Sequence, residues 1–525
     1  MPVVISSIKT ALDAKKDIIF SKALKSVSIK MDEVKKIEIH KTSLDARNRN
    51  DIRFVHSVYI ELFDHEREKE LCNRKKYASY CENYEFSSSL KKGNENKRVA
   101  VIGFGPAGMF SALVLAENGI KPIVIERGEQ IDKRVSMVDT FMNGGALSVT
   151  SNIQFGEGGA GTFSDGKLTS RIKDKLSRYV LKRFNEFGAP EEILTKAKAH
   201  IGTDNLRSIV KAIRERIISL GGEIHFDTRL EDFTLKNRRI CEIKTNRFSL
   251  PVDDVILAIG HSARDTFELI SRKNIFIEPK PFSVGVRIEH KQRDVDLSLY
   301  GNHAENPLLP KGEYQLSKRN KDGRAVYTFC MCPGGYVVPA SSEEKTVVTN
   351  GMSEFCRDGE NANSALVVSV SSRDYGDKPL DGVCFQREIE SRAYKLSGED
   401  YSAPATTVEG FLSKKPSIKS DIQGTYSRGL RTVELRDLFP RFVTDMMEVG
   451  LGDFSKKMKC FGDGNAILTA PETRTSSPVR ITRTDDFHSL SCENLYPCGE
   501  GAGYAGGIMS AAVDGIKVAV QIIEN

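Results

Sequence analysis

The chain has 525 residues, of which 39% are hydrophobic and 28% are charged. This composition excludes a disordered or collagen-like protein, and at ~100–200 residues per domain it predicts about two to four folded domains. The formal net charge of +6 arises within residues 1–98, because acidic and basic residues balance in the remainder. Such a basic N-terminal region is typical either of a domain that binds an acidic partner or of an ordinary domain whose charges are solvated.

Residues 1–92 are predicted to form a small basic α+β domain. Alternating apolar residues from Phe54 to Leu62 predict a strand, and residues 36–40 predict its partner, with a polar turn at 43–51 between them. Residues 87–97 are small and charged, which indicates a linker. The start of the chain lacks the features of a signal peptide, so a cytoplasmic location away from membranes is expected.

A βαβ unit is predicted after the linker. Residues 99–102 form a short apolar run, a glycine-rich turn follows, and residues 109–118 have a helical pattern that Gly119 would end. A second apolar strand is predicted at 122–126. Further along, Asp204 is expected to cap a long amphipathic helix, and strands are expected at 223–226, 240–245 and 255–259. Residues 280–450 predict a mostly antiparallel sheet.

The turn of this βαβ unit matches the pattern G-x-G-x-x-G. Gly103 would permit the tight turn, Gly105 would let the backbone approach a diphosphate, and Gly108 would let helix and strand pack closely. The helix N-terminus would offer free N–H groups to the phosphates. Glu126 ends the next strand, where its carboxylate would accept hydrogen bonds from a ribose and repel a 2′-phosphate. The motif therefore predicts FAD or NAD, and not NADP.

Two later segments favour FAD. The strand 255–259 runs into Gly260 and resembles the A-T-G strand end of flavoenzymes that have two dinucleotide folds. Residues 495–503 resemble the late G-D motif whose acidic residue contacts the ribityl chain, with Glu500 in place of Asp. No second G-x-G-x-x-G occurs, so any nicotinamide donor is expected to bind transiently, or another reductant to serve.

Five segments together resemble the family of uncharacterised FAD-dependent dehydrogenases, with distant similarity to geranylgeranyl reductases and aromatic hydroxylases. They are VAVIGFGPAGMFSALVLAENG, NIQFGEGGAGTFSDGKL, FCMCPGGYVVPA, RTSSPVRI and LYPCGEGAGYAGGIMSAAVDG. The resemblance implies an α/β fold: a two-dinucleotide-fold FAD-binding domain with a parallel sheet in ββα layers, an antiparallel-sheet substrate domain and the small N-terminal α+β domain. The expected boundaries are 1–92, 97–275 and 455–525 for the N-terminal and two FAD-binding segments, and 276–454 for the substrate domain.

The candidate cofactor-binding residues lie in these motifs and beside them. They are Gly103, Gly105, Pro106, Ala107, Gly108, Glu126, Arg127, Arg134, Gly158, Gly159, Gly161, Thr162, Gly260, Gly499, Glu500, Gly501 and Gly507.

Four residues are candidates for catalysis. Lys167 follows a glycine-dense stretch that would wrap the flavin ring, where it would stabilise a reduced flavin or simply be solvated. Cys330 and Cys332 share one side of a regular strand and are either active-site thiols or small buried hydrophobes. Their spacing makes a strained disulfide. The lone His261 is either an acid–base group or a structural residue.

Two arginines that follow the expected substrate domain allow two interpretations. Arg474 and Arg480, with nearby serines, would bind an anionic group or form an ion-pair network.

For the whole protein we expect an FAD-dependent oxidoreductase, a dehydrogenase or reductase that transfers hydride between flavin and a small molecule. The alternative is a flavin-containing binding or regulatory protein whose basic N-terminal domain docks nucleic acid or an acidic partner. No nucleic-acid motif and no C-x-x-C metal or redox pair is found.

Overall fold

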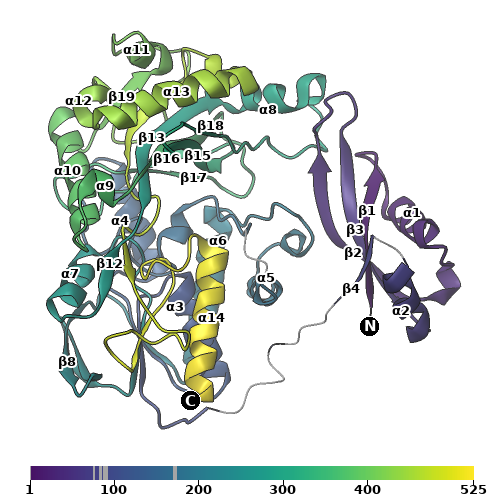
Figure 1. The fold of residues 1–525 in the computed structure, drawn as a ribbon, viewed down its shortest axis with the longest axis horizontal. Coiled ribbons are helices and arrows are strands. Elements are labelled where there is room, and N and C mark those ends of the chain that lie inside the picture. The colour runs from purple at the N-terminus through teal and green to yellow at the C-terminus, as the bar shows by residue number, and fades with distance from the viewer. Residues whose placement is uncertain (1, 75–76, 82–85, 87–92, 170–173) are drawn as a thin grey trace.

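The computed structural model describes residues 2–74, 77–81, 86, 93–169 and 174–525 and shows three parts (Figure 1). The N-terminal domain comprises residues 2–81, the parallel-sheet domain comprises 93–279 and 479–525, and the antiparallel-sheet domain comprises 282–475. The predicted linker lies partly outside the described residues. No helix among the described residues combines the length and apolar character needed to cross a bilayer.

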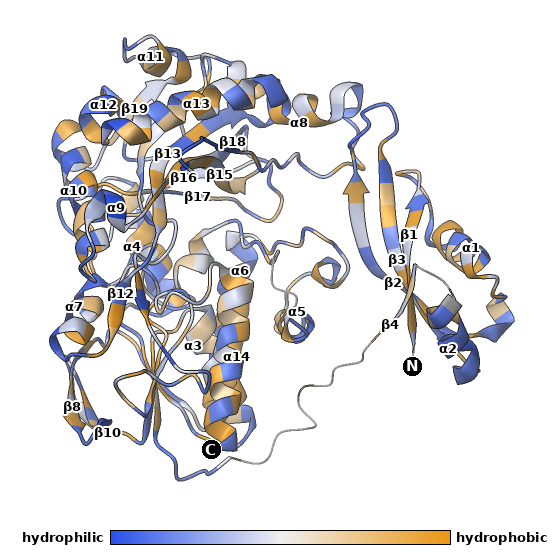
Figure 2. Ribbon diagram, in the orientation of Figure 1, coloured by the Kyte–Doolittle hydropathy of each residue, from blue (hydrophilic) through white to orange (hydrophobic). Residues whose placement is uncertain are grey.

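The N-terminal domain is a four-stranded sheet in the order β2-β3-β1-β4 with two helices on one face. As predicted, β2 and β3 are antiparallel partners, with Ile37 opposite Ile60. Alternate strand residues such as Val58 and Ile60 pack with Leu24 of α1, while Figure 2 shows α2 almost wholly hydrophilic. The elements are β1 (Val3–Thr10), α1 (Lys16–Val27), β2 (Val34–Asp45), β3 (Arg53–Leu62), α2 (His65–Arg74) and β4 (Ala78–Tyr80).

The parallel-sheet domain is built around five parallel strands in the order β23-β11-β5-β6-β7. The predicted βαβ unit forms its centre, although its helix begins at Pro106, three residues earlier than expected, because a proline suits the first helical turn. The elements are β5 (Val99–Ile102), α3 (Pro106–Glu117), β6 (Ile123–Ile125), α4 (Ile131–Met142), α5 (Leu176–Glu186), α6 (Thr203–Ser219), β7 (Glu223–His225), β8 (Leu230–Lys236), β9 (Arg239–Thr245), β10 (Ser249–Pro251), β11 (Asp254–Leu257), α7 (Arg264–Arg272), β12 (Ile277–Pro279), β22 (Val479–Ile481), β23 (Leu495–Pro497) and α14 (Ile508–Glu524).

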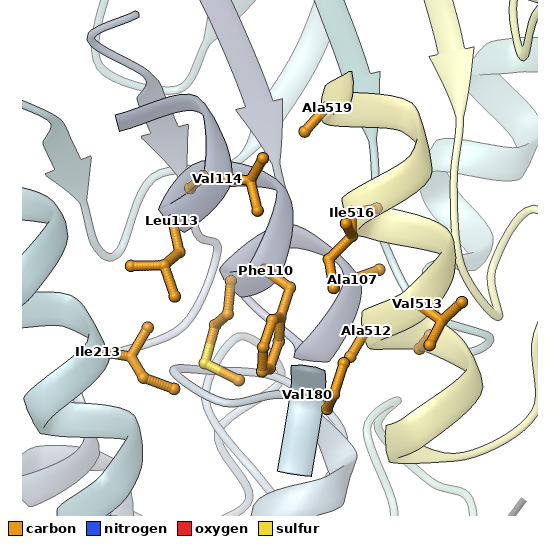
Figure 3. Close-up of a cluster of buried hydrophobic side chains, with 14 of the residues drawn as sticks. Ala107, Phe110, Leu113, Val114, Val180, Ile213, Ala512, Val513, Ile516 and Ala519 are labelled. Atoms are coloured by element: carbon orange, nitrogen blue, oxygen red, sulfur yellow. The ribbon is translucent and has the colours of Figure 1, made fainter. Parts of the chain in front are cut away.

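Helices α3 and α14 come from opposite ends of this domain's sequence and pack side by side (Figures 1 and 3). Phe110 of α3 and Ile516 of α14 lie in one buried cluster. A Cβ on Gly515 would lie 2.2 Å from the carbonyl oxygen of Ala107, so only glycine permits this approach. Ser111 Oγ donates to the Gly515 carbonyl at 3.0 Å or to Ala107, which links the helices.

The antiparallel-sheet domain has seven strands in the order β14-β15-β18-β13-β21-β19-β20, antiparallel except for β19 with β20. Strand β21 lies beyond the expected boundary at residue 454, but it pairs with β13 and β19 and so belongs to this sheet. The elements are β13 (Phe282–Lys291), α8 (Gln292–Tyr300), β14 (Ser317–Arg319), β15 (Ala325–Cys332), β16 (Tyr336–Pro339), β17 (Thr349–Met352), β18 (Asn361–Val370), α9 (Ser372–Tyr375), α10 (Asp381–Leu396), β19 (Ala403–Thr407), α11 (Val408–Leu412), β20 (Leu430–Thr432), α12 (Leu435–Leu438), α13 (Arg441–Lys457) and β21 (Ile467–Glu472).

The N-terminal domain contacts the rest of the chain through β2 and through the turn that follows it, where Arg49 donates to the Ser298 carbonyl. The Thr42 N–H donates to the Thr195 carbonyl at 2.7 Å, and the Ala197 N–H donates to the Thr42 carbonyl at 2.8 Å. Beside them, His40 Nδ1 accepts from Arg178 at 2.9 Å. These contacts continue the edge of the small sheet by a short ladder.

Candidate active site

A cleft of about 240 Å³ opens between the two larger domains. Fourteen of the candidate residues line it, and they come from loops spread between residues 103 and 507 of the sequence. They are Gly103, Gly105, Pro106, Ala107, Glu126, Arg127, Gly159, Gly161, Lys167, Gly260, His261, Cys330, Glu500 and Gly507. The fold therefore brings most of the predicted cofactor and catalytic residues to one place.

The glycine turn has the geometry that its motif requires. Gly103 has φ +98°, and a Cβ on it would lie 2.4 Å from the Ala258 carbonyl oxygen. A Cβ on Gly108 would lie 1.9 Å from the Gly103 carbonyl oxygen, so the helix could not pack on the turn. A Cβ on Gly105, by contrast, would meet nothing closer than 3.6 Å, so its space is open to the cleft. The backbone is therefore closely packed at Gly103 and Gly108, whereas the space beside Gly105 is open to the cleft and leaves room for a diphosphate.

The Glu126 carboxylate organises the backbone around the turn. Its Oε2 accepts from the Phe104 N–H at 2.7 Å, and its Oε1 accepts from the N–H groups of Gly128 and Gly156, each at 3.0 Å. A carboxylate offers about four acceptor sites. One therefore remains for a hydroxyl in the cleft, so the side chain fits a ribose while also binding three backbone groups.

Arg134 does not line the cleft but holds the glycine-dense loop from behind. Its fully buried guanidinium donates to the carbonyl oxygens of Asn152 at 2.9 Å, Ile153 at 3.0 Å, Glu157 at 2.6 Å and Gly159 at 2.9 Å. Its planar fork thus fixes the loop conformation. The structure gives it a positioning role toward the cleft.

The other candidates outside the cleft lining support its walls. The Gly158 N–H donates to the Phe104 carbonyl at 2.9 Å, and Thr162 is buried beside it. The Gly499 N–H donates to the Asp514 carboxylate at 2.7 Å, and a Cβ on Gly501 would lie 2.5 Å from the Gly260 carbonyl oxygen. These residues set the path of the loops whose neighbours face the cleft.

Glu500 faces the cleft in a poorly solvated position. Burial raises its pKa to about 7, although the Gly507 N–H and the nearby Lys280 favour the carboxylate. The side chain is therefore partly protonated near neutral pH. A group in this state can donate or accept a hydrogen bond to a polyol chain.

Strand β15 departs from the regular geometry that its sequence predicts. Its pairing with β18 shifts between Phe329 and Cys332, and Cys330 has φ +44°, which is left-handed. Cys330 lines the cleft with Phe329, whereas Cys332 is completely buried and does not. The bulge is a local irregularity that alternation in the sequence cannot reveal.

Lys167 is held by the antiparallel-sheet domain rather than left in solvent. Its Nζ donates to the Met331 carbonyl and lies 4.0 Å from Asp165 and 3.9 Å from Glu313. Arg357 pairs with the same two carboxylates, at 2.5 Å to Asp165 and 2.7 Å to Glu313. This charge cluster bridges the two domains at the cleft edge.

His261 hydrogen-bonds to Ser262 and lies beside a buried ion-pair network that includes Arg474. Burial, with Arg474 and Arg264, lowers the pKa of His261 to about 3, so its imidazole is neutral at neutral pH. Glu390 pairs with Arg264 at 2.8 Å and with Arg474 at 3.0 Å, and Glu343 joins them. Of the two roles considered for Arg474, the structure shows the ion-pair network.

Sequence reasoning missed the buried pair beneath β15. Arg287 Nε and Nη2 each donate to Glu472 at 3.0 Å, Nη1 donates to the Cys330 carbonyl at 2.9 Å, and Nη2 also donates to Asn350 at 2.9 Å. Glu472 and Asn350 line the cleft. The arginine within the apolar run Val284–Ile288 could have indicated this pair, because a charged side chain in a buried strand requires a partner of opposite charge.

Comparisons with known proteins identify two matching regions and one protein that is similar over the whole chain. Residues 281–475 match the family "FAD-dependent protein, C-terminal domain-like", and residues 1–61 match a domain of unknown function. An uncharacterised protein of Clostridium beijerinckii is 46% identical over 532 residues, covering 100% of this chain and 99% of that one.

Two solved structures are also similar at low identity. A geranylgeranyl bacteriochlorophyll reductase-like protein of Thermoplasma acidophilum is 13% identical over 81% of this chain and 84% of that one, with a TM-score of 0.35. Glycine oxidase of Bacillus cereus is 11% identical over 81% and 94%, with a TM-score of 0.29. The chain belongs to the family of FAD-dependent proteins that share this C-terminal domain, and FAD is its cofactor.

Proposed function

We propose that the protein is an FAD-dependent oxidoreductase that transfers a hydride between the flavin and a small molecule held in the cleft. One observation carries the proposal. The open face of the glycine turn and the bulged end of β15 line the same cleft, so a single cavity offers a dinucleotide site and a second wall from another domain. Such interdomain clefts are the usual place for small-molecule sites.

Residues of the parallel-sheet domain would hold the cofactor. The N-terminus of α3 at Gly105 and Pro106 would face the diphosphate, and the remaining acceptor site of Glu126 would face the ribose. The bound FAD supplies two-electron redox chemistry. Arg134 would keep the loop around the ring in place without touching it.

The opposite wall would position the substrate. Phe329 is large, apolar and 43% exposed at the cleft, so it offers a surface for an apolar part of a small molecule. Neutral His261 could donate or accept one hydrogen bond there, and Lys167 adds a positive charge. These groups would orient a substrate rather than define its identity.

A pair of glycine variants tests cofactor binding separately from folding. Gly105→Ala adds a methyl group to open space at φ −80°, so the apoprotein should keep its melting temperature while the Kd for FAD rises at least about tenfold. Gly103→Ala is the contrasting variant, because its φ and its 2.4 Å clash should destabilise the fold itself. A colourless wild-type protein that cannot be reconstituted with FAD would refute the proposal.

We infer that any nicotinamide donor binds only transiently, because the sequence carries no second G-x-G-x-x-G. Anaerobic mixing with NADH or NADPH should therefore give no flavin reduction that saturates at a low donor concentration, and another reductant serves if neither reduces the flavin. Rapid reduction with a saturable binding constant far below millimolar would contradict this inference. No finding favours the regulatory alternative for the whole chain.

A further inference from the structure

The bulge of β15 carries two thiols, one lining the cleft and one behind it. In a regular strand, residues two apart lie about 7 Å apart along the chain. The left-handed Cys330 and the register shift break this regular geometry. Cys332 Sγ lies 3.5 Å from the Cys330 carbonyl oxygen, so its side chain turns back toward residue 330. The two cysteines therefore lie in one short irregular segment, where the regular strand spacing does not hold.

The two thiols have unequal surroundings. Cys330 faces the cleft, whereas Cys332 is fully buried behind it. The interaction with Cys332, together with the charges of Arg287 and Lys167, lowers the pKa of Cys330 against the opposing effects of burial and Asp165. The same interaction and burial raise the pKa of Cys332. Of the two sulfur atoms, the one that lines the cleft is therefore the more easily deprotonated.

Neighbouring cations also fix the backbone of this segment. Arg287 donates to the Cys330 carbonyl and Lys167 donates to the Met331 carbonyl, so both peptide groups between the sulfur atoms are held. Arg287 is itself fixed by Glu472. Two small buried hydrophobes would not require this arrangement.

We propose that Cys330 and Cys332 form a redox-active dithiol that exchanges two electrons with the FAD bound in the same cleft. The proposal rests on the proposed function, because the cofactor must occupy this cleft. In the oxidising direction the Cys330 thiolate and the Cys332 thiol form an S–S bond and the Cys332 S–H bond breaks. Two electrons and that proton pass to the oxidised flavin, which becomes the singly protonated reduced form. The reverse step regenerates the thiols.

The short spacing of the pair suits reversible chemistry. A disulfide across one intervening residue is strained, and strained disulfides are more easily reduced than structural ones. The pair would therefore act as a two-electron store between the flavin and a substrate, with Cys330 as the exposed attacking sulfur. The substrate class that this chemistry suits is a small disulfide or another compound that accepts electrons from a thiolate.

A reductive titration tests the proposal without a known substrate. The holoprotein is oxidised with ferricyanide, desalted and titrated anaerobically with dithionite while the flavin absorbance is followed. Wild type should consume four electrons per FAD, and Cys330→Ser and Cys332→Ser should each consume two. Cys384→Ser, which changes an exposed thiol outside the cleft lining, should still consume four.

Thiol counting gives a second measurement that needs no variant. The oxidised, unfolded wild type should show two fewer free thiols than its ten cysteines, and peptide mapping should locate the missing pair at 330 and 332. Uptake of two electrons per FAD with ten free thiols would overturn the dithiol proposal while leaving FAD function intact. A protein that binds no FAD would instead overturn the proposed function.

Discussion

At the scale of single residues, Glu126 has two tasks that one substitution can separate. Glu126→Gln replaces one acceptor oxygen by an N–H₂ group that faces the N–H of Phe104 or those of Gly128 and Gly156. A buried donor left without an acceptor costs ~1–3 kcal/mol. We expect the apoprotein to lose about that much unfolding free energy, measured by denaturant titration, and the Kd for FAD to rise as well.

Glu129→Gln is the matched control for this substitution. Glu129 is three residues away and its carboxylate makes a loose pair with Lys133 at 3.5 Å. Such a surface pair contributes little, so the change in unfolding free energy should stay below ~0.5 kcal/mol. Equal stability of the Glu126 and Glu129 variants would show that the backbone around the turn does not depend on the carboxylate.

His261 provides a test of charge rather than of stability. Its pKa of about 3 lies below the ordinary value near 6.5, so the folded protein keeps it neutral throughout pH 5–8. We expect its ring-nitrogen resonances, identified by their loss in His261→Gln, to stay constant over that range in NMR spectra of histidine-labelled protein. A titration step near pH 6.5 would show that the imidazole is not shielded as the structure implies.

At the scale of elements, the contact between α3 and α14 holds the two ends of the parallel-sheet domain together. Gly515→Ala would place a methyl group 2.2 Å from the Ala107 carbonyl oxygen and force the helices apart. Overpacking of this kind costs ~1–3 kcal/mol. We expect that loss in denaturant unfolding, together with weaker FAD binding, because Ala107 also lines the cleft.

Gly452→Ala in α13 is the helical control. Nothing lies within 4 Å of the added Cβ, and alanine favours a helix over glycine by up to ~1 kcal/mol. This variant should be as stable as wild type or more stable. If Gly515→Ala and Gly452→Ala had the same free energy of unfolding, the close approach of α3 and α14 would not contribute to stability.

The elements also show what local sequence can predict. The strand, turn and helix from Val99 to Glu117 follow from apolar runs and glycine positions, which act over a few residues. Asp204 instead lies inside the first turn of α6 and accepts from the Phe355 N–H. That contact spans about 150 residues, so the local capping pattern could not disclose it.

At the scale of the whole molecule, pairing between strands that are far apart in the sequence determines the features that local sequence patterns do not predict. The fold class could be predicted, and so could several of the loops that line the cleft, because each motif marks its own loop. The placement of β21 beside β13, and so the Arg287–Glu472 pair between them, required the three-dimensional sheet. The bulge at Cys330 arises from the same strand pairing and was equally invisible to periodicity.

Attachment of the N-terminal domain is another whole-molecule property and should depend on pH. His40 Nδ1 accepts a hydrogen bond from Arg178 only when the imidazole nitrogen is unprotonated. Burial, then Arg178 and Lys41, lower the pKa of His40, while Glu38 opposes them. The docked state therefore binds fewer protons than a detached one. Docking should be strongest above the unperturbed value near 6.5 and weaken as pH falls through it.

Hydrogen exchange at the docking ladder measures this effect directly. The amides of Thr42 and Ala197 bridge the two parts, so their protection factors, corrected for intrinsic exchange, should fall between pH 7.5 and 5.5. His40→Gln keeps an acceptor for Arg178 but cannot titrate, and its protection should be the same at both pH values. Amides of β5 in the parallel-sheet domain serve as internal controls and should not change. Protection that is pH-independent in wild type, or that falls equally in His40→Gln, would show that His40 does not govern the attachment.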